Sequence, residues 1–145
     1  MRNKVEVHAA KHEAFNTGDL DGCVSLFAES ATYTDHPRGL VLRGRNEIKQ
    51  WLSEWKRAFS DARCTDIRYM ETENSSISRF VGRGTNDGPL GDLPATGREF
   101  AIPHCDIFEF DSLGRILTAE HYYDQLSVLQ QLGHVAAPEP APASR

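Results

Sequence analysis

Residues 100–123 read FAIPHCDIFEFDSLGRILTAEHYY and decide the fold. Two stretches of strand-forming residues, 100–110 and 116–123, flank the sequence Asp-Ser-Leu-Gly, which is typical of a tight turn. The pattern therefore predicts a β-hairpin. Because successive side chains of a strand point to opposite faces, each of these strands has one face for the core and one for the outside.

Two polar residues, His104 and Asp106, stand in the middle of the apolar face of the first hairpin strand. A carboxylate on such a face is costly unless it is paired or protonated, and an enclosed reactive pocket is one reason for it. An equally open explanation is that Asp106 forms a hydrogen bond with a neighbouring residue and that His104 is a core histidine whose ring nitrogens are hydrogen-bonded. Across the hairpin, His121 can reach the same pocket and transfer protons there. Alternatively, it lies at the rim of the pocket and forms a hydrogen bond with Glu120 or solvent.

The remaining elements put helices in the first half of the chain and strands in the second. This order predicts an α+β fold in which helices cover one face of a curved antiparallel sheet. The second helix begins after its capping residue Asp19, and its apolar face runs to Phe27. The other expected helices are 3–16, 46–59 and 125–132, and the expected strands are 31–35, 64–71, 77–85, 100–110 and 116–123.

A further acidic residue, Asp35, ends the expected strand 31–35 directly before His36 and Pro37. An aspartate at this position is explained by turn chemistry, since its side chain can bond the backbone that follows. The residues alone favour that interpretation over a catalytic one.

Composition excludes several classes of protein. The chain has 145 residues, a formal net charge of −5 and no cluster of Lys and Arg, so we expect one domain, residues 1–133, that does not bind nucleic acid. Its apolar runs are too short for a membrane span or a secretory signal, and its three scattered cysteines suit a reduced, cytoplasmic protein. Residues 134–145, rich in Pro and Ala, predict a disordered tail.

Several strings resemble the nuclear transport factor 2-like superfamily: FNTGDLD at 15–21, FAESATY at 27–33 and LRGRNEI at 42–48. LPATGR at 93–98 and YDQLSVL at 123–129 are similar to its SnoaL-like polyketide cyclase branch. The resemblance covers roughly residues 3–133. It implies a cone-shaped, cystatin-like α+β barrel: a curved antiparallel sheet packed against N-terminal helices around one apolar pocket. It also implies a homodimer.

Ketosteroid isomerases share this fold, and the resemblance places their general base at Asp35 and their oxyanion-hole acid at Asp106. Their oxyanion tyrosine falls near Lys11, which is a departure from the isomerase pattern. The acid/base aspartate and histidine of SnoaL-like cyclases fall at His121 and Asp106. This chain thus has a histidine where those cyclases have the aspartate, and an aspartate where they have the histidine. A carboxylate–imidazole pair across the hairpin is therefore kept.

These observations predict a cofactor-free enzyme of the lyase or isomerase type, without a metal. It would remove a proton α to a carbonyl of a small hydrophobic substrate, such as a polyketide-derived ester, for aldol cyclisation or isomerisation. His121 and Asp106 would transfer the proton, with Asp35 as a second base or orienting group. Residues expected to shape the pocket are His104, Tyr33, Trp55, Phe108 and Tyr123.

Burial and mutual repulsion of the two carboxylates predict a raised pKa for Asp106. Two other functions stay open. The same fold could hold a small ligand without turnover, or could activate water as a hydrolase or dehydratase.

Overall fold

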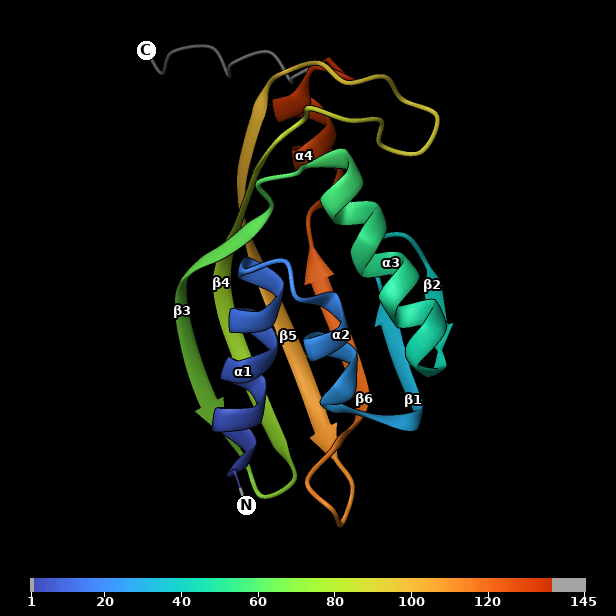
Figure 1. Ribbon diagram of the computed structural model, residues 1–145. Helices are drawn as coiled ribbons and strands as arrows, with labels where there is room; N and C mark the ends of the chain where they lie inside the picture. The colour runs from blue at the N-terminus through green and yellow to red at the C-terminus, as the bar shows by residue number, and fades with distance from the viewer. Residues whose placement is uncertain (1, 137–145) are drawn as a thin grey trace, which may run out of the picture.

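The computed structural model describes residues 2–136. Its centre is a curved sheet of six strands, and the first three helices lie on one face of that sheet (Figure 1). The helices are α1 (Lys4–Asn16), α2 (Leu20–Ser25), α3 (Gly44–Ala58) and α4 (Gln125–Leu132). The strands are β1 (Phe27–Asp35), β2 (Leu40–Arg43), β3 (Arg63–Glu71), β4 (Ser75–Thr85), β5 (Glu99–Phe110) and β6 (Ile116–Tyr123). The expected α+β class is therefore present.

The predicted hairpin is confirmed as β5 and β6, and its register decides the site. Asp106 pairs directly with His121 across the two strands. In the turn, the carboxylate of Asp111 accepts hydrogen bonds from the backbone N–H groups of Leu113 and Arg115, at 2.9 Å each. Both partners of the predicted carboxylate–imidazole pair are consequently on the helix-covered face.

Strand order corrects the expectation of a sheet that is antiparallel throughout. The order is β2-β1-β6-β5-β4-β3, and β1 runs parallel to β6. Parallel strands need a long crossover, and here the chain between β1 and β6 forms α3 and four strands, β2 to β5, before it returns. Strand β1 also begins earlier than expected, because Phe27 pairs with Ile116 in the sheet and does not extend α2. The short strand β2 was not expected.

Local chemistry explains where the helices begin. Asn3 and Glu6 form a capping box at the start of α1. The side chains of Asp19 and Asp124 cap α2 and α4, and the first of these two caps was expected. Helix α3 buries Ile48, Trp51 and Leu52 on its sheet-facing side, and it confirms the helix expected over residues 46–59.

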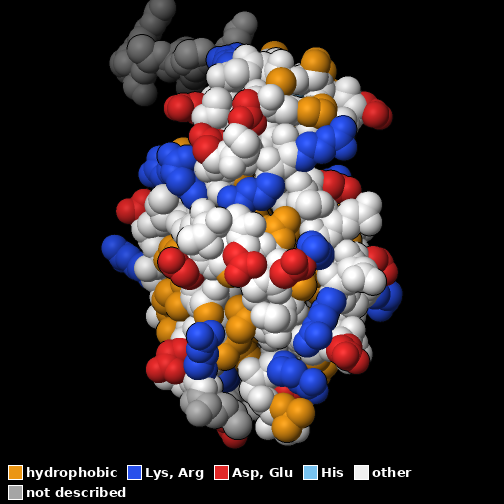
Figure 2. Space-filling model, in the orientation of Figure 1, with side chains coloured by type: hydrophobic (Ala, Val, Ile, Leu, Met, Phe, Trp, Pro, Cys, Tyr) orange, Lys and Arg blue, Asp and Glu red, His pale blue; other side chains and the backbone are white. Residues whose placement is uncertain are grey.

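The surface agrees with the acidic but mixed composition. Acidic and basic side chains intermingle on the face shown in Figure 2. In the part of the chain that the structure describes, no helix is long and apolar enough to cross a membrane. The expected tail lies outside the described residues from position 137 on. Its first residue, His134, places Nε2 3.2 Å from the Asn86 side-chain oxygen.

Candidate active site

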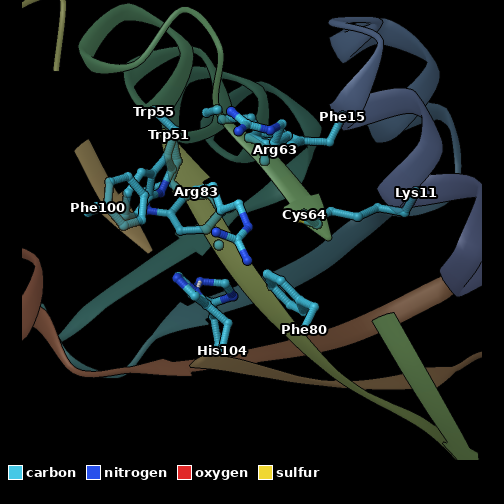
Figure 3. A pocket seen from close by; sticks show the side chains of 14 residues that line it. Lys11, Phe15, Trp51, Trp55, Arg63, Cys64, Phe80, Arg83, Phe100 and His104 are labelled. Carbon is cyan, nitrogen blue, oxygen red and sulfur yellow. Dashed lines mark hydrogen bonds between the residues drawn. The ribbon is translucent and has the colours of Figure 1, made fainter. Parts of the chain in front are cut away.

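A cavity of about 420 Å³, counting its opening to solvent, lies between the helices and the sheet (Figure 3). The space inside it that a water-sized sphere can occupy is about 40 Å³, which is small for a small-molecule site. Most of its wall is apolar: Phe15, Trp51, Leu52, Trp55, Ala62, Cys64, Phe80, Gly82 and Phe100. Its polar lining residues are Lys11, Arg63, Arg83, His104 and His121. No carboxylate belongs to this lining.

Three buried polar side chains form a chain of hydrogen bonds that ends at the cavity. Asp106, which is fully buried, accepts a hydrogen bond from Nδ1 of His121. The other ring nitrogen of His121, Nε2, lies 3.0 Å from Nδ1 of His104. With an ionised Asp106 and neutral rings, His121 donates to Asp106 and His104 donates to His121. This assignment leaves the lone pair of His104 on Nε2.

Electrostatics correct one prediction. Burial by itself would raise the pKa of Asp106, but the charge and hydrogen bond of His121, together with Lys11, hold it well below its usual range. The raised pKa expected from two repelling carboxylates is therefore wrong, because the neighbours of Asp106 are nitrogen groups. Burial lowers the pKa of His104 to about 3, and the charge of His121 acts in the same direction. His104 is accordingly neutral near pH 7.

The free nitrogen of His104 is held in a defined place. Nε2 is buried and has no hydrogen-bond partner within residues 2–136. The ring is stacked between Phe80 and Tyr123, with centroids 5.0 Å from each. Nε2 lies against Gly82, where an added Cβ would collide with it. Gly82 and His104 both line the cavity, so the absence of a side chain at Gly82 makes room for the ring.

Asp35 has a different position from the one expected. It is fully buried and does not line the cavity. Its Oδ2 accepts hydrogen bonds from Nε1 of Trp51 at 3.0 Å and from the hydroxyl of Tyr123 at 3.3 Å. The Trp51 indole does line the cavity, so Asp35 contributes to the cavity wall by holding that ring in place through its hydrogen bond.

The other predicted residues divide between the cavity and the core beneath it. His121, His104 and Trp55 line the cavity. Tyr33 and Phe108 are fully buried, and the Tyr33 hydroxyl lies 3.4 Å from Nδ1 of His121. Asp106 lies one layer behind His121. Tyr123 lines a separate groove that it shares with Trp55.

Sequence reasoning missed the polar inner face of α1. His8, Lys11 and His12 are buried there beside Phe15. Nδ1 of His8 lies 2.8 Å from the Ser76 hydroxyl, and Nε2 of His12 lies 3.2 Å from the Ser78 hydroxyl. The spacing 8, 11, 12, 15 is the signal that could have found this face, since residues three and four apart share one side of a helix.

His8, His12 and Asp106 form a group with the donor types of a metal site. Their candidate ligand atoms all lie within 4.8 Å of one another. Burial is the main cause that lowers the pKa of His8 to about 4 and that of His12 well below 6.5, so both rings are neutral. The charge of Lys11 contributes to both shifts and would also repel a cation. We therefore interpret the two histidines as neutral packing groups.

Comparison with known proteins defines the class. The profile of the SnoaL-like polyketide cyclase family matches residues 6–132, so the chain belongs to this family. IdmH of Streptomyces antibioticus, a candidate polyketide cyclase, is 26% identical; the match covers 91% of this chain and 99% of IdmH, with a TM-score of 0.78.

Two further solved structures share the fold. A candidate polyketide cyclase of Pseudomonas putida is 21% identical over 92% of this chain and 100% of its own, with a TM-score of 0.82. A protein of ketosteroid isomerase-like fold from Catenulispora acidiphila is 23% identical over 88% of this chain and 92% of its own, with a TM-score of 0.77. None of the curated proteins matches the chain.

Proposed function

We propose that this protein transfers a proton from the carbon next to a carbonyl group of a small, largely apolar substrate, as the first step of an aldol cyclisation or an isomerisation. One observation carries the proposal. The hydrogen-bonded chain Asp106–His121–His104 ends in an unpartnered nitrogen, His104 Nε2, on a residue that lines an apolar cavity. Four buried side-chain atoms within residues 2–136 have no hydrogen-bond partner, and among them His104 Nε2 belongs to the residue that lines the cavity, which favours a functional role for it.

The arrangement suits general-base catalysis. His104 Nε2 takes the proton from carbon, and the proton on Nδ1 of His104 moves to Nε2 of His121. The positive charge then rests on His121, next to the ionised Asp106, in the same way that a buried carboxylate stabilises a histidine base in other enzymes. His104 alone would be a weak base, because its pKa is about 3. Sharing the proton with His121 removes that disadvantage.

The electron pair of the broken C–H bond becomes an enolate. In a cyclisation, the enolate carbon attacks a second carbonyl of the same molecule, and the resulting alkoxide takes the proton back from the histidine pair. In an isomerisation, the proton returns to a different carbon. Both sequences begin and end with the same protonation of the enzyme, so neither consumes a co-reactant.

A solvent-exchange assay tests the proposal without knowledge of the natural substrate. Cyclisable β-keto esters in D₂O are followed by NMR for deuterium at the α-carbon. The variant His104→Asn keeps a donor where Nδ1 is and removes the Nε2 lone pair, so exchange should fall by about 100-fold or more.

The control is His36→Asn, because His36 is about 39% exposed and pairs with Glu120 outside the cavity. It should exchange at the wild-type rate. If the wild-type protein binds these esters but exchanges none of them, the protein is a ligand-binding module and the enzymatic proposal is wrong.

A further inference from the structure

Lys11 is an almost completely buried cation whose side chain lines the cavity. Only 3% of its surface is exposed. Its Nζ lies 5.6 Å from the ring centre of Phe15, 5.8 Å from that of Tyr33 and 5.9 Å from that of Phe108. Within residues 2–136, the side-chain hydrogen bonds and ion pairs include none from Nζ. In Figure 3, the side chain extends from α1 toward Cys64 at the cavity wall.

Burial of this ammonium group is only partly compensated. The three aromatic faces attract a cation, and the charge of Asp106 attracts it from beyond hydrogen-bond distance. None of these groups accepts a hydrogen bond from Nζ. A buried ammonium group has three N–H donors and is costly to leave without acceptors. A ligand that enters the cavity can supply this acceptor.

The rest of the cavity lining favours a negatively charged acceptor. Its formally charged residues are Lys11, Arg63 and Arg83, although the whole chain has a net charge of −5. Arg63 and Arg83 face each other across β3 and β4, an unfavourable placement for like charges. Carboxylates outside the cavity, Asp61 and Asp66, lie 3.6 Å and 3.5 Å from them and offset part of that repulsion.

We propose that Lys11 Nζ binds the negatively charged oxygen of the ligand, and that the cavity selects compounds that carry or develop an enolate or phenolate oxygen there. The catalytic part of this inference rests on the proposed function. When His104 removes the proton, the electron pair of the C–H bond moves to the carbonyl oxygen, and the ammonium group of Lys11 donates a hydrogen bond to it. No covalent bond to Lys11 forms.

A binding experiment tests the role of Lys11 without turnover. The probe is 4-nitrophenol, whose phenolate form has its own absorption band, and the uncharged comparison is nitrobenzene. On wild-type protein, the bound probe should ionise at least about one pH unit lower than in water, which is a tenfold preference for the phenolate. Lys11→Met, of similar length, should abolish this preference and leave the affinity for nitrobenzene unchanged.

The control variant is Lys56→Met. Lys56 also lies over the Phe15 ring, at 4.3 Å, but its Nζ donates to the carbonyl of Ala62 and it does not line the cavity. This variant should keep the phenolate preference. If Lys11→Met does not fold, equal binding of the phenolate and nitrobenzene by the wild-type protein would still overturn the inference.

Two binding results would overturn the inference: equal binding of the phenol and phenolate forms of 4-nitrophenol by the wild-type protein, or no binding of either probe. A third contrary result would be borohydride trapping of a carbonyl compound on Lys11, because that reaction requires the lysine to act as a neutral nucleophile. Phenolate preference without deuterium exchange on any β-keto ester would keep this inference and remove the proposed enzymatic function.

Discussion

His104 Nδ1 lies 3.0 Å from His121 Nε2, so both ring nitrogens of His121 are engaged before any ligand enters the cavity. The sequence predicts His121 and Asp106 as the proton-transfer pair and assigns His104 to the pocket wall. The contacts support a different division of labour within the same three residues. In our proposal, His104 meets the substrate, and His121 and Asp106 accept the positive charge behind it.

The role of Asp106 can be tested by comparing Asp106→Asn with Asp106→Ala. An ionised Asp106 accepts a hydrogen bond from His121, and an asparagine amide cannot stabilise a positive charge on that ring. Both variants should therefore lose deuterium exchange to a similar extent, by about 100-fold or more. Much higher activity in the asparagine variant would mean that position 106 acts as a hydrogen-bond donor.

Asp35 should behave as a positioning residue. Asp35→Asn keeps an oxygen for Trp51 Nε1 and the Tyr123 hydroxyl, so it should retain most of the exchange rate constant at saturating substrate, while KM rises modestly. Asp35→Ala leaves both donors without an acceptor and should destabilise the fold by about 1–3 kcal/mol in urea denaturation. Loss of exchange in the folded asparagine variant would instead support the second base predicted from the sequence.

The stability of the protein should fall in mild acid. The pKa of His8 is lowered to about 4 and that of His104 to about 3, whereas an unfolded histidine titrates near 6.5. Between these values the unfolded chain binds more protons, so the free energy of unfolding decreases as the pH falls below about 6.5.

For His8 alone the loss between pH 7 and pH 4 is roughly 3 kcal/mol. Urea denaturation across this range measures it. His8→Asn, which keeps a group near the Ser76 hydroxyl, should flatten the pH dependence. An unchanged slope in this variant would show that His8 does not titrate as described.

Gly82→Ala should disturb the site through His104. A Cβ at this position would collide with Nε2 of His104, whose ring is confined between Phe80 and Tyr123. We expect a destabilisation of about 1–3 kcal/mol and loss of deuterium exchange. The comparison is Gly91→Ala, where an added Cβ meets nothing and only the positive φ of 59° is strained. Full exchange in Gly82→Ala would contradict the placement of the His104 ring.

Local patterns predicted much of this fold, and long-range pairing explains the main errors. The β5–β6 hairpin and helix α3 follow from alternation and helical spacing, which a short stretch of sequence contains. The parallel pairing of β1 with β6 joins segments about 80 residues apart, and no local pattern specifies it. The homodimer stays a prediction.

The candidate site was predicted less completely than the fold. The inner face of α1 was missed because Lys11 and its histidine neighbours are polar, so apolar periodicity pointed elsewhere. The pKa of Asp106 was predicted to be raised and is lowered instead. The direction of the shift depends on whether the nearest charged group is a carboxylate or a nitrogen group. Asp35 was expected beside it, whereas His121 is the group that bonds it.

The protonation of the two histidine rings is the most direct test of the central claim, which is that the chain from Asp106 leaves a lone pair on His104 Nε2. The measurement is ¹⁵N NMR of the imidazole nitrogens at pH 7, with His104→Asn and His121→Asn used to assign the signals. The account predicts neutral rings with the proton on Nδ1 in both His104 and His121. A proton on Nε2 of His104 would leave no base at the cavity and would contradict the account.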